Sequence, residues 1–295
     1  MKKFIILIPL FNDWKSVSRL LNEIDLQVNN WDAEVSIFII NDASTEKRSE
    51  ISFNCKKIRS IKILNMAQNR VHQRCIAAGL KYISKNETFD RVIIMDADGE
   101  DRPIELNDFI KKAEENPNMT ITGNRFKRSE GIVFKFLYEI HKILTFVFTG
   151  KLIKFGNFSC LPKKHVEQLI QKAYLWNSYS SSVVRTIDDR TFIKSIRGTR
   201  YVQPSKMNFS GLIFHSLTII SVFRNMFVLR SILYFLIYLF LISNNLSVIT
   251  VLPILFLLIF FSIIIKISFR SNLKELNLSL NNIASIDILD DTNRR

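Results

Sequence analysis

The sequence predicts an α/β fold with a mostly parallel sheet, followed by a hairpin of two transmembrane helices. Three observations predict it. Short Ile- and Val-rich runs alternate with helix-like stretches over the first 122 residues, polar clusters follow four of these runs, and two long apolar runs occupy residues 226–242 and 246–265. Strands that are buried on both faces of a parallel sheet read as continuous apolar runs. The 295 residues suffice for about two domain-sized units.

The five expected strands are residues 4–8, 35–40, 60–64, 91–95 and 119–122. The chain begins with MKKFIILIPLF, which could also be a secretory signal. Its apolar run is short, has no small-residue cleavage site and ends at Asn12 and Asp13, so we expect a buried strand. The three cysteines are too scattered for a disulfide framework or a zinc site, which favours a reducing cytoplasm.

The two apolar runs near the C-terminus are each close to the ~20 residues that a bilayer-spanning helix needs. Only residues 243–245 separate them, so we expect a hairpin that crosses twice. Basic residues favour a cytoplasmic location for both of its ends, with Arg224 and Arg230 before it and Lys266, Arg270 and Lys274 after it. The alternative is a buried hairpin of a soluble protein, although two adjacent near-spanning runs are hard to bury.

This organisation divides the chain into a cytoplasmic domain over residues 1–208, an interfacial amphipathic segment over 209–225, two transmembrane helices within 226–268 and a cytoplasmic tail over 269–295. The net charge of +14 is distributed unevenly. Residues 1–119 carry 18 basic and 18 acidic residues, so the whole excess follows them, next to the membrane segment. A basic surface beside a bilayer favours anionic lipid or a phosphorylated substrate, and we expect no nucleic-acid partner.

Ligands of parallel sheets bind beyond the carboxyl ends of the strands, where this chain has polar clusters. The most informative cluster follows the fourth strand and has four carboxylates within six residues: Asp96, Asp98, Glu100 and Asp101. Such carboxylates repel one another unless a cation or hydrogen-bond donors compensate them. Hard oxygen ligands suit Mg²⁺ or Mn²⁺. The alternative is a solvated acidic turn that caps a helix starting near Pro103.

Four motifs, IPLFND, NDAS, NRVHQRCIAAGL and MDADGEDRPIEL, resemble in order and spacing those of the inverting family 2 glycosyltransferases with a GT-A fold. In particular they resemble the polyprenyl-phosphate sugar transferases of the dolichol-phosphate mannose synthase type, over roughly residues 3–215. The resemblance implies a nucleotide-sugar site formed by Pro9, Phe11, Asn12, Asp13, Asp42 and Asp96. It also implies that Asp98 of the D-x-D motif is a metal ligand and that Glu100, where relatives often have glutamine, is a second.

The resemblance extends to basic residues in the second half of the chain. The string RYVQPSKM resembles the R-x-x-G-x-S-K segment with which polyprenyl-phosphate transferases hold the acceptor phosphate. It implies an acceptor-phosphate site formed by Arg125, Arg128, Arg200, Ser205 and Lys206. Arginine and lysine donate charge-assisted hydrogen bonds to phosphates, although a basic face on the membrane surface is the alternative. Where relatives often have G-D-F-R, residues 156–159 read GNFS and lack both charged groups.

The expected activity is inverting transfer of a sugar from a nucleotide-diphosphate sugar to a membrane lipid, with polyprenyl phosphate favoured as acceptor. Asp98, Asp101 and Arg125 are the candidate catalytic residues, and Asp101 is the candidate base if the acceptor is a hydroxyl. A bound Mg²⁺ or Mn²⁺ would stabilise the charge that develops on the leaving diphosphate. Two alternatives stay open: transfer to a saccharide or lipid hydroxyl, and a noncatalytic nucleotide-binding component of a glycan assembly complex.

The expected location is the cytoplasmic (inner) membrane, with the catalytic domain facing the cytoplasm. Association of protomers through their spanning helices is left open. His72, which stands near the expected diphosphate, is by itself more typical of a structural hydrogen-bond partner than of a catalytic group.

Overall fold

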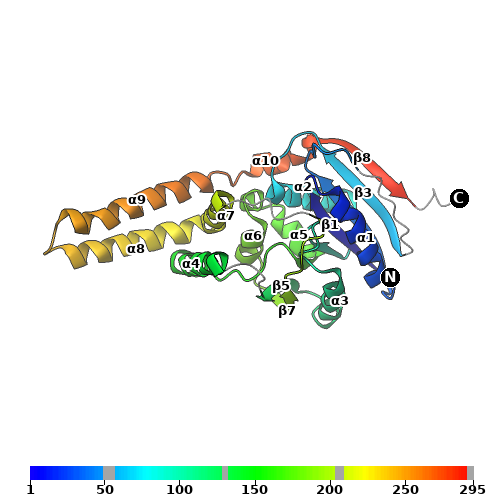
Figure 1. The fold of residues 1–295 in the computed structure, drawn as a ribbon, viewed down its shortest axis with the longest axis horizontal. Helices are drawn as coiled ribbons and strands as arrows, with labels where there is room; N and C mark the ends of the chain where they lie inside the picture. Colours follow the sequence, from blue (N-terminus) through cyan, green and yellow to red (C-terminus); the bar gives the residue numbers. More distant parts are fainter. Residues whose placement is uncertain (49–56, 128–131, 203–208, 291–295) are drawn as a thin grey trace.

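A computed structural model describes residues 1–48, 57–127, 132–202 and 209–290. An α/β domain forms one end of the molecule, and a long helical hairpin projects from it (Figure 1). The predicted fold class is confirmed. The five expected strands are all present, with boundaries close to the predicted ones.

In the described residues the sheet has eight strands, in the order β7-β5-β6-β4-β1-β2-β3-β8. Their bounds are β1 (Lys2–Leu10), β2 (Ala33–Asn41), β3 (Ile58–Met66), β4 (Arg91–Ile94), β5 (Thr120–Lys127), β6 (Ser159–Pro162), β7 (Arg190–Ile196) and β8 (Ile283–Asp290). The strands β1 to β4 run parallel to one another, as their apolar runs predict. β6 and β8 are antiparallel to their neighbours. Because β6 lies between β4 and β5, the fourth and fifth strands of the chain are not neighbours.

Helices cover both faces of the sheet. α1 (Trp14–Val28) and α3 (Leu106–Glu115) lie on one face, and α2 (His72–Asn86), α5 (Lys163–Leu169) and α6 (Tyr179–Thr186) lie on the other. In β1, Phe4, Ile6 and Ile8 pack toward α1, whereas Ile5 and Leu7 pack toward α2. Successive side chains of a strand point to opposite faces, which is why an uninterrupted apolar run is buried on both sides. Short 3₁₀ turns occupy Pro103–Glu105, Ala173–Trp176 and Ser279–Asn282.

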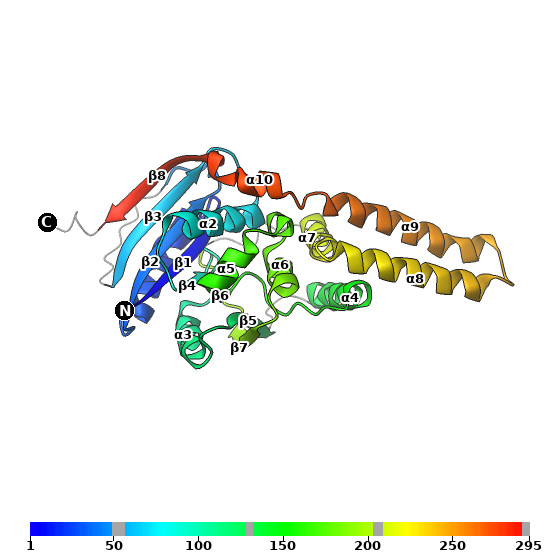
Figure 2. The ribbon, with the colours of Figure 1, turned by 180° about the vertical axis from the view of Figure 1, so that it is seen from behind.

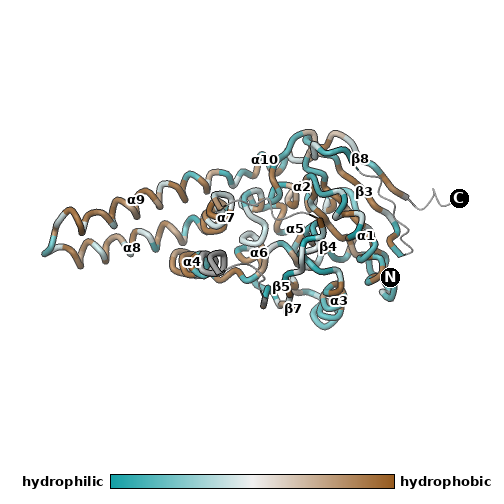
Figure 3. The backbone as a smooth tube through the Cα atoms, viewed as in Figure 1, coloured by the Kyte–Doolittle hydropathy of each residue, from teal (hydrophilic) through white to brown (hydrophobic). Residues whose placement is uncertain are grey.

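Two apolar helices leave the domain as a hairpin. Within the described residues, α8 (Arg224–Ile242) and the helix that begins with α9 (Val248–Ser268) are long and apolar enough to cross a membrane. Figure 3 shows their predominantly hydrophobic colouring. Their large side chains are exposed, with Phe240 at 80%, Val248 at 81% and Ile249 at 79%. Soluble monomers rarely expose so large an apolar surface, so the alternative of a buried hairpin is wrong and a bilayer is the environment that fits.

Two more apolar helices lie at the base of the hairpin. α4 (Ile132–Thr149) packs against α8, and α7 (Phe209–Ser221) packs against α9. Aromatic rings meet at this junction, where the ring centroids of Phe148 and Phe227 are 5.3 Å apart and those of Phe148 and Phe260 are 5.1 Å apart. Other apolar side chains of α4 and α7, such as Ile143 and Phe209, are exposed. Exposed apolar side chains beside a membrane-spanning hairpin are typical of interfacial helices.

Arg230, a charged residue inside α8, caps α4. Its Nη1 donates to the carbonyl oxygens of Val147 at 2.9 Å and Phe146 at 3.3 Å, and the Tyr234 hydroxyl donates to that of Val147 at 2.8 Å. The last carbonyls of a helix have no partner within it. Gly150 follows with a φ of 70°, and a Cβ added there would lie 2.6 Å from the Arg230 guanidinium. The cap explains a charge in this otherwise apolar helix.

The segment after α9 returns to the α/β domain (Figure 2). α10 (Leu273–Asn277) packs against α2 with Leu276 buried, and the Trp176 indole N–H donates to Glu275 at 2.7 Å. β8 then pairs with β3 at the edge of the sheet. The sequence predicts only a polar tail with a short helix here, and the strand β8 is an addition to that prediction. Both ends of the hairpin are therefore attached to the same domain.

Candidate active site

The carboxyl ends of β1, β2 and β4 meet at one edge of the sheet. Leu10 pairs in register with Asn41, and Leu7 pairs with Ile94. The loops that follow these strands are therefore neighbours in space. They carry most of the predicted site residues, and each of the three loops contributes an aspartate: Asp13, Asp42 and Asp96.

The loop over residues 96–101 carries the four carboxylates and folds back on itself. The Asp96 N–H donates to Asp101 Oδ2, and the Glu100 N–H donates to Asp98 Oδ1, both at 2.9 Å. Gly99 has a φ of 87°, in the region that favours glycine. Two of the carboxylates thus stabilise the turns of the loop that carries them, which we call the D-x-D loop.

A second segment, residues 196–201, lies against the D-x-D loop, and we call it the strap. Its Gly198 N–H donates to the Glu100 carbonyl at 2.9 Å, and its Tyr201 N–H donates to the Asp98 carbonyl at 3.0 Å. The approach is so close that a Cβ added at Gly198 would lie 2.4 Å from the Gly99 carbonyl oxygen. The strap extends β7, so the end of this strand fixes its position over the carboxylates.

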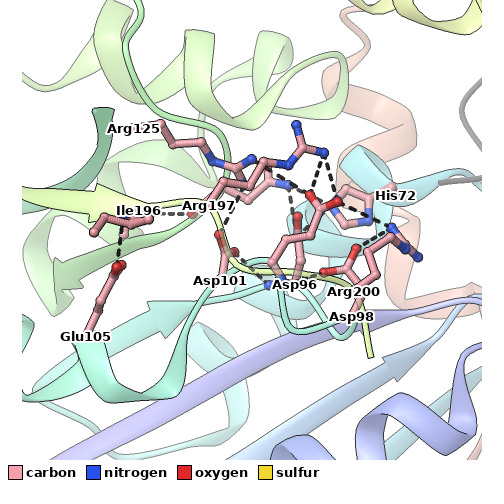
Figure 4. Close-up of polar contacts among 12 residues, drawn as sticks. His72, Asp96, Asp98, Asp101, Glu105, Arg125, Ile196, Arg197 and Arg200 are labelled. Carbon is pink, nitrogen blue, oxygen red and sulfur yellow. Dashed lines mark hydrogen bonds and ion pairs between the residues drawn. The ribbon is translucent and has the colours of Figure 1, made fainter. Parts of the chain in front are cut away.

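Three arginines point into the carboxylate cluster, two from the strap and one from β5 (Figure 4). Arg200 contacts Asp98 at 2.5 Å and Asp13 at 3.3 Å. Arg125 contacts Asp101 at 3.2 Å. Arg197, which the sequence did not single out, contacts both oxygens of Glu100, at 2.8 and 2.6 Å. The guanidinium groups compensate the repulsion that four neighbouring carboxylates would otherwise suffer.

The carboxyl groups of the loop differ in acidity because their surroundings differ. Burial raises the pKa of Asp96, but the His72 imidazole, Arg125 and Asn157 outweigh burial and bring it down to about 2. Burial and the charge of Asp96 raise the pKa of Asp98 to about 6 and that of Asp101 to about 8. Asp101 is only 1% exposed, with one oxygen bound to the Asp96 N–H and the other to Arg125. No exposed oxygen is left there for an acceptor hydroxyl.

Asn157, in the GNFS segment, contacts the same cluster. Its amide nitrogen donates to Asp96 Oδ1 at 3.1 Å and lies 2.7 Å from His72 Nε2. The orientation of its amide is fixed by Gln73, which donates to Asn157 Oδ1 at 3.2 Å and accepts from the Tyr179 N–H at 2.7 Å. His72 is thus a hydrogen-bonded neighbour of Asp96, a contact that the linear sequence does not reveal. The uncharged GNFS segment supports the cluster through hydrogen bonds instead of charge.

The predicted nucleotide residues stabilise loops around this edge. Asp42 is buried, its Oδ1 accepts from the Arg70 N–H at 2.8 Å, and burial raises its pKa. Asn12, with a φ of 51°, accepts the N–H groups of Thr45 at 2.8 Å and Glu46 at 3.0 Å, which joins the loop after β1 to that after β2. The contacts of Asp42 and Asn12 with a nucleotide stay predictions.

Two further predicted residues differ in exposure. Phe11 is half-exposed at the rim, whereas Pro9 is buried within β1 opposite Ile40. Three predicted acceptor residues, Arg128, Ser205 and Lys206, lie outside the described residues.

The family model of glycosyl transferase family 2 matches residues 5–178, which is more than half of the chain and includes the whole D-x-D loop. The chain belongs to glycosyl transferase family 2. The resemblance seen in the four sequence motifs is thereby confirmed.

This chain resembles curated relatives over part of their length. An undecaprenyl-phosphate 4-deoxy-4-formamido-L-arabinose transferase of Salmonella choleraesuis (strain SC-B67) is 24% identical over 171 residues, which are 57% of this chain and 50% of the relative. The transferase of the same name from Salmonella newport (strain SL254) gives the same identity and coverage. The chain therefore spans about half the length of the curated relatives it matches.

A solved structure shares the fold of this family 2 chain. Glucosyl-3-phosphoglycerate synthase from Mycobacterium tuberculosis, in complex with Mn²⁺, uridine-diphosphate-glucose and phosphoglyceric acid, superimposes with a TM-score of 0.54. The two chains are 11% identical, and the match covers 76% of this chain and 79% of the other. At this identity the likeness shows the fold, which is the GT-A fold that the motifs imply.

Two carboxylates of the family 2 site fit a divalent cation. Nη1 of Arg200 lies 2.5 Å from Asp98 Oδ2 and 4.0 Å from Glu100 Oε1, so a positively charged group already sits between them. In the described part of the chain, no group of three or more His, Cys, Asp or Glu side chains is arranged around one metal position. Mg²⁺ commonly binds one or two carboxylates and keeps its other positions for water and substrate phosphates. Asp98 and Glu100 suit such a cation.

Proposed function

We propose that the protein is a membrane-anchored inverting glycosyltransferase that transfers a sugar from a nucleotide-diphosphate sugar to the phosphate of a membrane lipid, with polyprenyl phosphate as the acceptor class. The observation that carries the proposal is the convergence of the D-x-D carboxylates with Arg125, Arg197 and Arg200 at the carboxyl ends of the strands. A family 2 domain with both carboxylates and arginines at one site has partners for a cation and for phosphates. The name of the Salmonella relatives, undecaprenyl-phosphate transferases, supports the lipid acceptor.

The residues of the site would divide the work between donor and acceptor. Asp98 and Glu100 would hold Mg²⁺ or Mn²⁺, and the cation would stabilise negative charge on the leaving diphosphate. Asp13, Asp42 and Asp96 would border the nucleotide, together with Pro9, Phe11 and Asn12. A lipid phosphate is already ionised at pH 7, so its oxygen needs no general base, which agrees with the burial of Asp101.

Arginine and lysine would hold the acceptor phosphate through charge-assisted hydrogen bonds. We keep Arg125 and Arg200 in this role, and Arg128, Ser205 and Lys206 with them as part of the proposal. The guanidinium groups of Arg125 and Arg200 already contact carboxylates of the D-x-D loop. An acceptor phosphate held there would lie beside the donor, as direct attack on the anomeric carbon requires.

We further propose that the hairpin spans the cytoplasmic membrane twice, with residues 1–208 and 269–295 both on the cytoplasmic side and residues 209–225 at the interface. The attachment of β8 to β3 supports an even number of crossings, because the chain before and after the hairpin belongs to one sheet. The basic residues that flank the hairpin support the cytoplasmic side. Asn244→Cys and Ala284→Cys, both at exposed positions, test this topology when each is the single cysteine of the chain and is treated with a membrane-impermeant thiol reagent. We expect only the cysteine at residue 244 to react from outside.

The activity is tested by incubating membranes that contain the protein with a panel of labelled nucleotide sugars and a lipid extract. We expect an acid-labile glycolipid that requires a divalent cation and is lost in Asp98→Asn. The matched control is Asp108→Asn, because Asp108 lies on α3 away from the cluster. An acid-stable product would move the acceptor to a hydroxyl. Metal-dependent nucleotide binding without any product would favour a noncatalytic component of a glycan assembly complex.

A further inference from the structure

The Glu100 carboxylate lies among three guanidinium groups. Its two oxygens contact Nη2 of Arg197 at 2.8 and 2.6 Å. The nearest guanidinium nitrogen of Arg125 lies 3.8 Å from Glu100 Oε2, and that of Arg200 lies 4.0 Å from Oε1. Its side chain is 11% exposed. Glu100 is thus an enclosed anion on which cationic side chains from β5 and the strap converge.

The backbone holds these arginines in place without any help from Glu100's side chain. Arg125 pairs in register with Ser195 of β7, and Arg197 follows two residues later in the strap. The strap is held by its own backbone hydrogen bonds, among them Gly198 N–H to the Glu100 carbonyl. The sheet and the strap therefore set the backbone positions of the three arginines. Carboxylates other than Glu100 hold the guanidinium groups of Arg125 and Arg200, so a different anion could take the place of the Glu100 carboxylate.

A phosphate monoester would use this arrangement more fully than the carboxylate does. Each guanidinium has five N–H donors, and a carboxylate has only two oxygens. Of the three arginines, only Arg197 reaches Glu100 at hydrogen-bond distance. A phosphate monoester has three terminal oxygens and almost two negative charges near pH 7, and arginine binds it with bidentate geometry.

We propose that Glu100 is an internal competitor for the acceptor phosphate: its carboxylate occupies a site formed by Arg125, Arg197 and Arg200, and a phosphate monoester binds there when Glu100 turns away. The inference rests on the proposed function for the identity of the acceptor. It adds Arg197 to the phosphate ligands and gives Glu100 a role that glutamine cannot have. In this chain, where residues 156–159 lack an arginine, Arg197 supplies the third guanidinium.

A coupling between cation and acceptor follows. Asp98 and Glu100 are the two carboxylates that fit a divalent cation, so binding of the cation draws Glu100 away from Arg197. By linkage, a cation that raises the affinity for the phosphate must be bound more tightly, by the same factor, when the phosphate is present. Neither effect requires turnover, so both can be measured in the absence of a sugar donor.

The test measures the affinity of the full-length protein in lipid nanodiscs for farnesyl phosphate and for inorganic phosphate by calorimetry, with and without Mn²⁺. In the wild type we expect Mn²⁺ to raise the affinity about tenfold, a change that corresponds to about one charged hydrogen bond. In Glu100→Gln we expect the affinity without Mn²⁺ to rise about tenfold and to respond little to Mn²⁺. Arg197→Gln should weaken binding about tenfold in every condition, with part of the affinity kept in Arg197→Lys.

Arg59→Gln is the matched control, because exposed Arg59 pairs with Glu34 at the start of β3, the end of the strand that lies away from the cluster. Its affinity for the phosphates should be unchanged. Electron paramagnetic resonance of bound Mn²⁺ gives the reciprocal measurement, in which farnesyl phosphate should tighten Mn²⁺ binding in the wild type by the factor seen in calorimetry.

Two outcomes would overturn the inference: an unchanged phosphate affinity in Glu100→Gln, or loss of farnesyl phosphate binding when a nucleoside diphosphate is added, which would assign the arginines to the donor. If Glu100→Gln changes the affinities for inorganic phosphate and for farnesyl phosphate equally, the site recognises the phosphate group alone. If it changes only the affinity for farnesyl phosphate, the site recognises a lipid headgroup. Failure of the proposed function is distinguishable. Phosphate binding as expected without sugar transfer from any donor would refute only the function.

Discussion

The contact between strap and D-x-D loop leads to a sharp prediction for Gly198→Ala. The added Cβ would lie 2.4 Å from the Gly99 carbonyl oxygen, whereas ordinary contacts begin at 3.4 Å. The oxygen is a backbone atom and the Cβ is bonded directly to the backbone. The two segments must therefore separate by about 1 Å, because no flexible side chain can yield in their place. This separation lengthens and weakens the hydrogen bonds that the Gly198 and Tyr201 N–H groups donate to the D-x-D loop.

The expected magnitudes follow from these contacts. Two weakened backbone hydrogen bonds, at about 0.5–1.5 kcal/mol each, lower the free energy of unfolding by about 1–3 kcal/mol. The same shift moves the guanidinium groups of Arg197 and Arg200 relative to Glu100 and Asp98. A displacement of about 1 Å in a reacting complex can reduce the rate about 100-fold, so we expect sugar transfer to be lost at temperatures at which the variant is still folded.

Sugar transfer and thermal unfolding in detergent measure the two effects on the same preparation. Gly156→Ala is the matched control, because the nearest atom to its added Cβ is Nη2 of Arg125 at 3.8 Å, an ordinary contact. We expect this control to change the free energy of unfolding by less than about 0.5 kcal/mol. Wild-type turnover and stability in Gly198→Ala would refute the role of the strap in positioning the arginines.

Three other changes have defined outcomes. Val71→Gly should raise the free energy of unfolding by about 1 kcal/mol in chemical denaturation, because a β-branched residue at a φ of 75° is strained; a lower stability would contradict the strain. Arg230→Met should lower it by about 1.5–3 kcal/mol by removing the α4 cap, and the exposed Arg224→Met should not. Leu276→Ala, at a fully buried site, should lower the free energy of unfolding by about 2–5 kcal/mol. The control Leu278→Ala, at a half-exposed site, should lower it far less. Equal losses would mean that α10 does not pack as described.

The parallel core of the sheet could be predicted because its signals are local. The runs in β1 and β2 are apolar without interruption, and this pattern is typical of strands that are covered on both faces. β6 and β8 could not be predicted in the same way. β6 is as short as β4, but its sequence SCLP has a serine and a proline in place of the apolar run of β4. β8 alternates apolar residues with Ser285 and Asp287 because it is an edge strand.

The carboxylates of the candidate site could be predicted from the sequence, whereas most of the side chains that contact them could not. Four acidic residues within one loop are visible in the sequence, and parallel-sheet geometry places that loop at the binding edge. Arg197 was missed because its pairing with Glu100 joins residues 97 positions apart. A local signal did exist, since Arg197 stands three residues before Arg200, the first residue of the string RYVQPSKM. The roles of His72 and Asn157 depend on Gln73, whose side chain joins α2 to α6.

The hairpin is joined to the site by a line of hydrogen bonds. Asn177, just before α6, donates to Ser221 at the end of α7 at 3.0 Å. Two residues later, the Tyr179 N–H donates to Gln73, which donates to Asn157, and Asn157 donates to Asp96. Asn177, Tyr179 and Ser221 are buried, and a broken hydrogen bond there leaves an unpaired polar group at a cost of about 1–3 kcal/mol. The domain is therefore connected to its hairpin at both ends of the hairpin and through this line. If these connections keep the domain at a fixed height above the bilayer, the proposed lipid acceptor has to bring its headgroup to the arginines.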